Sequence, residues 1–239
     1  MSYESGLFAL AVLFYLYDST VLLYSNEAVL TRTGGKWSAN TGYYGFLFAG
    51  RTLCVLNPLG PHQPAYRLSW DFHALPPAPP AACLAESGAL KILTPTSLGA
   101  AIGLFILLPL GMFTALGAFA VIPALILLYG SIIASLILVR SRHILLAQDR
   151  KRFIALAFEC LACPPFGVNL VRRTTLSYRI TEPLPLAAVR LLDAASWATL
   201  RALCLSRLQD ALQLAAADSN EEKLLEAQKT RLMALGGAA

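Results

Sequence analysis

The strongest hydrophobic pattern lies in the middle of the chain, between Lys91 and Arg140, where no charged residue occurs. If this stretch is helical, it is about 70 Å long, which allows two crossings of an about 30 Å hydrocarbon core and a turn. The arms of the expected pair of helices cover residues 98–115 and 119–139, and Gly117 lies near the turn. The pattern therefore predicts a transmembrane helical hairpin.

Another apolar run covers residues 7–24, and its length just reaches that of a bilayer-spanning helix. Asp18 lies inside this run, and a carboxylate at membrane depth is costly enough that it normally faces protein, water or a basic partner. Two interpretations stay open: an interfacial carboxylate at the inner end of a short helix, or a functional or pairing role. We expect a retained transmembrane helix, because the run lacks the basic segment and cleavage site of a signal peptide.

Between this run and the hairpin, the periodicity changes from helix to strand. Gly34 and Gly35 can supply the positive φ angles of a two-residue hairpin turn. A proline-rich stretch at 76–80 is typical of a stiff spacer. We expect a small antiparallel sheet with strands at 28–33, 36–39, 43–48, 51–56 and 66–72.

The apolar run at 153–171 is interrupted by Glu159 and by two prolines at 164–165. We expect one helix to end near Cys163 and another to begin at the prolines, both lying in or against the membrane. A fourth span is disfavoured because Arg172 and Arg173 would then emerge on the wrong side.

The segment at 186–217 is rich in Leu and Ala, and its leucines fall nearly all round a helical projection. A helix without a solvent face needs a cover, so we expect lipid or another subunit to bury it. Ser219 and Glu222 form a capping box for a last helix, which we expect to end at Gly236 and Gly237.

The pattern as a whole predicts a mainly α membrane protein with three transmembrane helices, one N-terminal and two in the hairpin. A small antiparallel β insertion lies between the first and second of them, and the C-terminal cytoplasmic region is helical. The expected divisions are a first transmembrane helix at 1–25, a cytoplasmic β subdomain at 26–75, a Pro-rich linker at 76–96, the hairpin at 97–139, a basic and interfacial helical segment at 140–183, and C-terminal helices at 184–239.

Composition supports a membrane protein, since only 14% of the 239 residues are charged and 56% are hydrophobic, against about 25% charged in soluble domains. The net charge of +5 does not indicate nucleic-acid binding, because the basic residues are not gathered among interleaved aromatics. They follow the hairpin instead, which predicts an outside N-terminus and a cytoplasmic C-terminus in a bacterial inner membrane. The residues concerned are Arg140, Arg142, Arg150, Lys151 and Arg152.

Cys160 and Cys163 have the only spacing typical of a metal or redox pair. A structural zinc site needs four ligands, and neither a second Cys pair nor a His pair is present. We therefore interpret the two as small buried cysteines and expect no cofactor. A metal or haem site assembled from separate segments stays open, with His62, His73 and His143 as its available imidazoles.

Polar residues among apolar neighbours are the other candidates for function. Asp18, Glu159 and Asn169 either face a basic membrane surface or line a polar cavity or subunit contact. A further set of basic residues could contact anionic lipid headgroups, namely Arg140, Arg142, Arg172 and Arg173.

Three hypotheses for function follow. The first is a non-catalytic accessory or scaffolding subunit of a membrane complex, which contacts other protein subunits and lipid through its cytoplasmic sheet and C-terminal helices. The second is a transporter or permease component, with Asp18 and Glu159 along a polar path. The third is a membrane enzyme that acts on a lipid-linked substrate, although no complete catalytic set is visible in the sequence.

Overall fold

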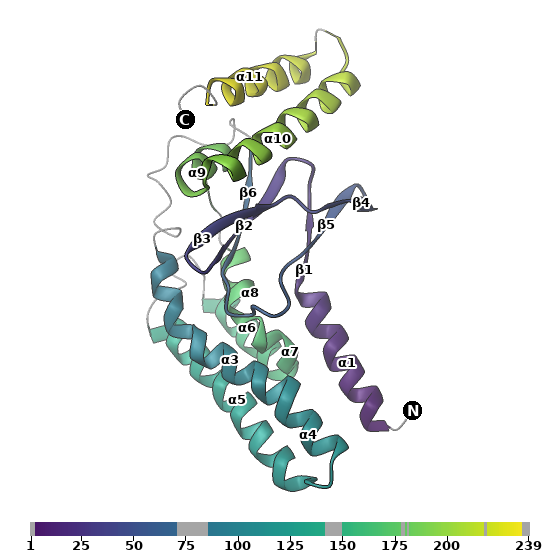
Figure 1. The fold of residues 1–239 in the computed structure, drawn as a ribbon, viewed down its shortest axis with the longest axis vertical. Helices are drawn as coiled ribbons and strands as arrows, with labels where there is room; N and C mark the ends of the chain where they lie inside the picture. The colour runs from purple at the N-terminus through teal and green to yellow at the C-terminus, as the bar shows by residue number, and fades with distance from the viewer. Residues whose placement is uncertain are drawn as a thin grey trace. The chain divides into compact units, whose positions relative to one another are not determined.

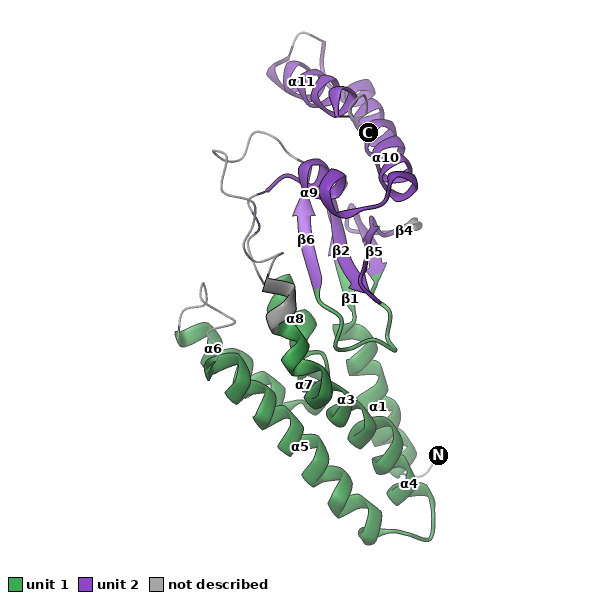
Figure 2. Cartoon of the chain, turned by 60° about the vertical axis from the view of Figure 1, so that its left-hand side comes forward, with its two compact units in different colours: residues 1–21, 55–64, 84–178 green, residues 22–54, 65–83, 179–239 purple. Residues whose placement is uncertain are grey.

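The computed structural model describes residues 3–70, 86–141, 150–177, 180, 182–217 and 219–235. The chain forms two compact units whose segments alternate along the sequence (Figure 2). Unit 1 comprises Met1–Val21, Val55–Pro64 and Leu84–Tyr178, and unit 2 comprises Leu22–Cys54, Ala65–Cys83 and Arg179–Ala239.

The predicted hairpin is present in unit 1, where one arm packs along the other (Figure 1). After a short 3-10 helix, η1 (Glu86–Leu93), the first arm is formed by α3 (Thr94–Ile102), a π-helical turn η2 (Gly103–Leu107) and α4 (Leu108–Phe113). The second arm is α5 (Ala118–Ser141). The π-helical turn ends just before Pro109, which has no N–H to donate and whose ring would crowd the carbonyl four residues earlier.

Two glycines allow the arms to approach closely. A Cβ on Gly103 would lie 3.1 Å from the carbonyl oxygen of Ala124, and one on Gly111 would lie 2.7 Å from the backbone nitrogen of Val121. Small residues at such positions are typical of helices that pack in lipid, where apolar burial gives little drive for association.

Two helical stretches, Leu90–Phe113 and Ala118–Ser141, are long and apolar enough to cross a membrane. Only 28% of the most apolar window of each is buried inside the chain, whereas the core helix of a soluble protein is mostly buried. Their outward apolar faces need a cover, and a bilayer supplies one. These helices support membrane association.

The first apolar run is helical only as far as Asp18, where one of the two interpretations placed the inner end of a short helix. Helix α1 (Tyr3–Asp18) ends inside the expected span, and β1 (Thr20–Leu23) follows it. The β-branched Thr20 and Val21 favour extended backbone after the helix. At 16 residues, α1 is about 24 Å long and therefore shorter than an average hydrocarbon core.

The five predicted strands are present, with small shifts of their ends, and β1 adds a sixth that the sequence analysis missed. They are β2 (Glu27–Thr33), β3 (Lys36–Asn40), β4 (Tyr43–Phe48), β5 (Arg51–Val55) and β6 (Ala65–Ser69). The strands form two three-stranded sheets, in the orders β1-β5-β4 and β3-β2-β6, rather than a single sheet. Thr33 pairs with Lys36 across the predicted two-glycine turn, where both glycines have positive φ. The proline-rich spacer lies outside the described residues.

The break predicted near Cys163 is also present. Helix α6 (Arg150–Ala162) ends there, because Pro164 excludes helical backbone at the residue before it. The chain then continues as α7 (Pro164–Val168) and α8 (Leu170–Leu176). A Cβ on Gly167 would lie 2.5 Å from the Cδ1 of Ile132, so α7 packs closely against α5.

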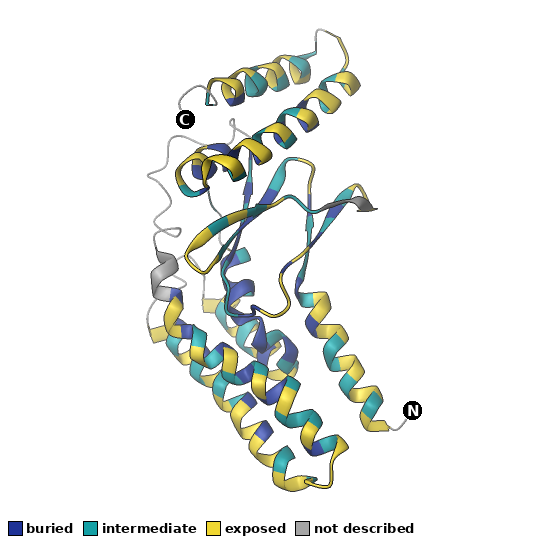
Figure 3. Cartoon of the chain, viewed as in Figure 1, coloured by how far each residue is buried: buried dark blue, intermediate teal, exposed yellow. Residues whose placement is uncertain are grey.

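The C-terminal segment of unit 2 forms α9 (Leu184–Leu191), α10 (Ala194–Leu214) and α11 (Asn220–Ala234). The prediction that 186–217 is one helix without a solvent face is wrong. Asp193 interrupts it by capping α10, its Oδ1 accepting from the backbone nitrogen of Ser196 at 2.8 Å. One stripe of α10 is buried within unit 2, while polar residues such as Gln209 and Asp210 are exposed (Figure 3). The buried stripe consists of Trp197, Leu200, Cys204, Arg207 and Leu208.

The predicted cap of the last helix is confirmed. Ser219 Oγ accepts a hydrogen bond of 3.1 Å from the backbone nitrogen of Glu222. A hydroxyl at this position satisfies one of the donors that the first turn of a helix leaves unpaired.

Candidate functional site

The polar residues predicted from the apolar segments meet in unit 1, in a group that we call the arginine cluster. Helix α1 supplies Asp18, α6 supplies Glu159, and the turn between α7 and α8 supplies Asn169, with two arginines following on α8. Helices α7 and α8 carry the deepest burial of this region (Figure 3). The cluster consists of Asp18, Ser19, Glu159, Asn169, Arg172 and Arg173.

Arg172 is the centre of this cluster and is only 1% exposed. Its guanidinium donates to the carbonyl oxygens of Asn57 and Gly60, the second at 2.6 Å. It also donates to Ser19 Oγ and Asn169 Oδ1, each at 3.3 Å. Among the described residues, no carboxylate forms an ion pair with Arg172. The buried cation is therefore held by neutral oxygens, and it ties residues 57–60 to α8.

This burial corrects the prediction that Arg172 contacts lipid headgroups. A guanidinium has five N–H donors in a fixed planar fork, and here the fork points inward to backbone carbonyls. Burial lowers the pKa of Arg172 from its ordinary value, while the neighbouring Tyr15 and Asp18 act in the opposite direction. The group still carries its charge at neutral pH, since arginine does not deprotonate in proteins.

Arg173 joins the two predicted carboxylates. It donates to Asp18 Oδ1 at 2.7 Å and, with its other terminal nitrogen, to Glu159 Oε2. The Asp18 side chain is mostly buried, with 12% exposed, whereas that of Glu159 is 48% exposed. The guanidinium also lies over the ring of Phe166, 4.6 Å from its centroid. Asp18 and Glu159 therefore meet at one cation.

Asn169 and Ser19 complete the cluster with hydrogen bonds to α1. The Asn169 amide donates to the carbonyl oxygen of Tyr15 at 3.3 Å and to Ser19 Oγ at 3.1 Å. The Tyr15 hydroxyl donates to the carbonyl oxygen of Pro58. Two features of the cluster were missed by the sequence analysis: Ser19, and the turn at Asn57–Gly60 whose carbonyl oxygens accept from Arg172.

Two polar atoms at the cluster have no hydrogen-bond partner among the described residues, namely Asp18 Oδ2 and the Nδ1 of His62. Burial lowers the pKa of His62, and the positive charge of Arg172 lowers it further. His62 is therefore neutral at physiological pH and can offer one nitrogen as an acceptor. His73 and His143 lie outside the described residues.

The cysteine pair lies at the end of α6. Cys160 is fully buried, Cys163 is half-buried, and both are free thiols. Burial raises the pKa of Cys160 to about 12 and also raises that of Cys163. In the part of the chain that the structure describes, no three His, Cys, Asp or Glu side chains are grouped closely enough to hold a metal ion.

Arg140 lies exposed near the end of α5, as a headgroup contact requires, and Arg142 lies outside the described residues. In unit 2, a cavity of about 250 Å³ lies between β3 and α10. It is lined by hydroxyl and apolar side chains without an acid, base or thiol, namely Ser38, Ala39, Thr41, Ser196, Thr199, Leu200 and Leu203. This cavity can form hydrogen bonds but holds no group suited to proton transfer or nucleophilic attack.

Comparisons with protein-family models, curated proteins and solved structures gave no match.

Proposed function

We propose that this chain is a membrane-anchored, non-catalytic subunit that contacts partner proteins through the strands and C-terminal helices of unit 2. In this proposal the hairpin and α1 hold the chain in a bacterial inner membrane. α1 serves as a short third membrane helix whose inner end lies near Asp18. The hairpin ends and unit 2 face the cytoplasm, because the basic residues gather at the open end of the hairpin.

The observation that carries the proposal is the β4–β5 hairpin of unit 2. In the described part of the chain, β4 lies at the edge of its sheet, with β5 as its only neighbour. At the end of β4, Leu47 and Phe48 are 68% and 61% exposed. An edge strand with exposed apolar side chains invites pairing with another chain, and soluble proteins usually protect such edges with charge or proline. A partner that adds a strand and covers these side chains would satisfy both features.

The contacts of the arginine cluster favour a structural role for Asp18, Glu159 and Asn169, the polar residues that a transporter would need. Asp18 and Glu159 share Arg173, and Asn169 bonds to α1. Charges that compensate each other within the chain hold helices together without a mobile ion. Transport remains the second candidate, because the buried Asp18 Oδ2 has no hydrogen-bond partner among the described residues.

The test is co-purification of the full chain from its native membranes at native expression. The double variant Leu47→Ser/Phe48→Ser should lose most of the partner protein that the unchanged chain retains. Leu59→Ser serves as the matched control, because Leu59 is 88% exposed but lies in unit 1. Partner retention by the double variant would contradict the proposal, and loss with Leu59→Ser alone would assign the contact to unit 1.

The transport alternative makes a separate prediction. If Asp18 lies on a transport path, Asp18→Asn should abolish flux in cells while the chain still assembles. If Asp18 only holds α1 to α8, any loss of function should follow the loss of assembled chain. Measuring both quantities on the same membranes distinguishes the two candidates.

A further inference from the structure

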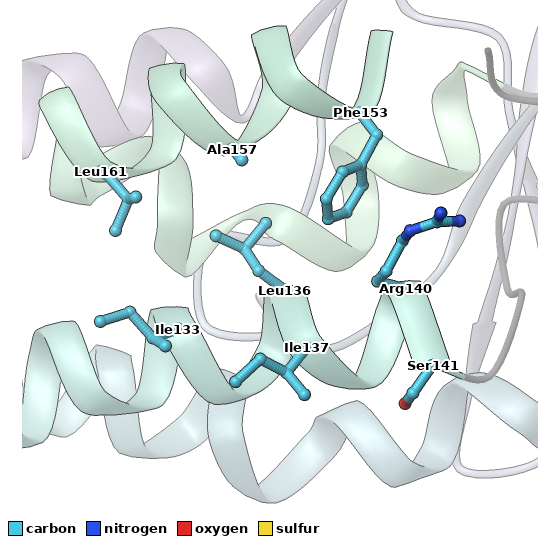
Figure 4. Close-up of a pocket in the computed structure, with 8 residues that line it drawn as sticks. All are labelled: Ile133, Leu136, Ile137, Arg140, Ser141, Phe153, Ala157 and Leu161. Atoms are coloured by element: carbon cyan, nitrogen blue, oxygen red, sulfur yellow. The ribbon is translucent and has the colours of Figure 1, made fainter. Parts of the chain in front are cut away.

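An apolar groove with a cavity volume of about 360 Å³ lies between α5 and α6 in unit 1 (Figure 4). One wall is formed by residues spaced three or four apart on α5, and the other by residues spaced four apart on α6. Such spacings place side chains on one face of a helix. The residues of the groove are Ile133, Leu136, Ile137, Arg140, Ser141, Phe153, Ala157 and Leu161.

The groove has one polar end and one apolar end. Figure 4 shows the guanidinium of Arg140 beside the ring of Phe153, with Leu161 and Ile133 at the opposite end. From Ile133 to Arg140 the axis of α5 advances about 10 Å. The site is thus an open apolar groove with a cation at one end, and its volume falls within the range of ligand pockets.

The surface around the groove is also apolar. Ile137 is 60% exposed, and on α6 Ile154 and Phe158 are 57% and 71% exposed. Because α5 is a candidate span with most of its apolar surface uncovered, the groove opens onto a surface that hydrocarbon would cover.

Positive charge gathers at the polar end. Arg140 is exposed at the end of the uncharged stretch, and among the described residues no carboxylate pairs with it. Three further basic residues stand exposed immediately before Phe153, namely Arg150, Lys151 and Arg152. A groove for hydrocarbon beneath a group of cations is complementary to a molecule with an acyl chain and an anionic head.

We propose that this groove binds an anionic phospholipid, with an acyl chain between α5 and α6 and the phosphate at Arg140. The guanidinium can donate two parallel hydrogen bonds to phosphate oxygens. In this arrangement the side chains of Ile133, Leu136 and Leu161 contact the acyl chain of the lipid. The proposal does not depend on a partner protein, so its test is separate from that of the proposed function.

The test is native mass spectrometry of the full chain in a mild detergent, titrated with phosphatidylglycerol or with phosphatidylcholine of the same acyl chains. The unchanged chain should bind phosphatidylglycerol about tenfold more tightly than phosphatidylcholine, because only the first has a net negative head. Arg140→Gln should weaken phosphatidylglycerol binding about tenfold and leave phosphatidylcholine binding unchanged.

A second variant tests the groove itself. Ala157→Trp fills the groove from α6 and should weaken the binding of both lipids. Lys223→Gln is the matched control, because it removes one exposed positive charge from α11 in unit 2. It should bind both lipids as the unchanged chain does.

Three results would overturn the inference. Arg140→Gln could keep full preference for phosphatidylglycerol, which would remove the headgroup contact. Ala157→Trp could bind both lipids normally, which would remove the groove. Finally, the unchanged chain could be a lipid-free dimer that Ala157→Trp separates, which would place a second copy of the chain in the groove.

Discussion

Among the described residues, each unit contains one buried arginine that donates to backbone carbonyls, and the two differ in what surrounds the charge. Arg172 in unit 1 donates to Asn57 and Gly60, which belong to one turn. Arg207 in unit 2 donates to Ser25 at 2.9 Å and Thr41 at 3.1 Å, which lie in two separate connections between strands. Both arginines therefore link a helix to irregular backbone.

The surroundings of each arginine decide how much it should contribute to the free energy of unfolding. Arg172 is 1% exposed and adds a hydroxyl and an amide as acceptors, so it depends wholly on polar partners. Arg207 is 7% exposed and lies over the ring of Trp70, 5.5 Å from its centroid, which supplies an aromatic face. Arg172 in unit 1 is thus surrounded by polar groups among apolar helices, whereas Arg207 in unit 2 has mixed apolar and aromatic surroundings.

The largest expected effect is that of Arg172→Met. The variant leaves the carbonyls of Asn57 and Gly60 without their donor, and unpaired buried polar groups are expensive, so we expect a loss of about 3 kcal/mol in the free energy of unfolding. Thermal unfolding of the full chain in mild detergent measures it. The control Arg140→Met removes an exposed charge and should change stability by less than about 0.5 kcal/mol. Equal effects of the two variants would refute the structural role of Arg172.

Arg207→Met should cost less, about 2 kcal/mol, because methionine can still pack against Trp70 while the carbonyls of Ser25 and Thr41 lose their donor. Arg172→Lys and Arg207→Lys sharpen the comparison. A lysine cannot reproduce the planar fork, so Arg172→Lys should recover less of the lost stability than Arg207→Lys, which keeps a cation over the ring. The reverse order in the same unfolding assay would contradict the contrast between the two units.

Within the arginine cluster, Asp18→Asn should cost about 1 kcal/mol, because its carboxylate is mostly buried against Arg173. Glu159→Gln should cost less than about 0.5 kcal/mol, since an exposed ion pair contributes little. Added salt should further reduce the effect of Glu159→Gln and leave that of Asp18→Asn nearly unchanged. If added salt reduced the stability effects of both variants equally, burial would not distinguish the Asp18–Arg173 pair from the Glu159–Arg173 pair.

The smallest effect concerns thiol chemistry. Burial raises the pKa of Cys160 in unit 1 and of Cys204 in unit 2 to about 12 each. A thiolate forms only as the pH rises towards the pKa, so at pH 8 both stay protonated and should resist maleimide in the folded chain. In a Cys83→Ser background, the half-buried Cys163 should react first, as mass spectrometry of the labelled peptides can show. Labelling of Cys160 as fast as Cys163 would disprove its burial.

The sequence predicted what depends on local pattern. The apolar hairpin, the turn at Gly34, the break before Pro164 and the cap at Ser219 all follow from neighbours within a few residues. The strand β1 after Asp18 was missed because the apolar run continues beyond the helix, and hydropathy does not distinguish an apolar helix from an apolar strand.

The arginine cluster was predicted as a set of unusual residues but not as one site. Asp18 and Arg173 are 155 positions apart, and no local pattern relates them. Arg207 on α10 shows the same limit, since a helical projection of the sequence could not reveal that its side chain turns inward to carbonyls of unit 2. Buried polar groups find partners through tertiary packing, which a single sequence does not disclose.

The most direct test of the central claim is the mass of the assembly that contains this chain, extracted from native membranes in mild detergent. We predict a species heavier than the 25.7 kDa chain that contains at least one other protein in fixed stoichiometry. A monodisperse, helical and stable monomer of this chain alone would contradict its role as a subunit.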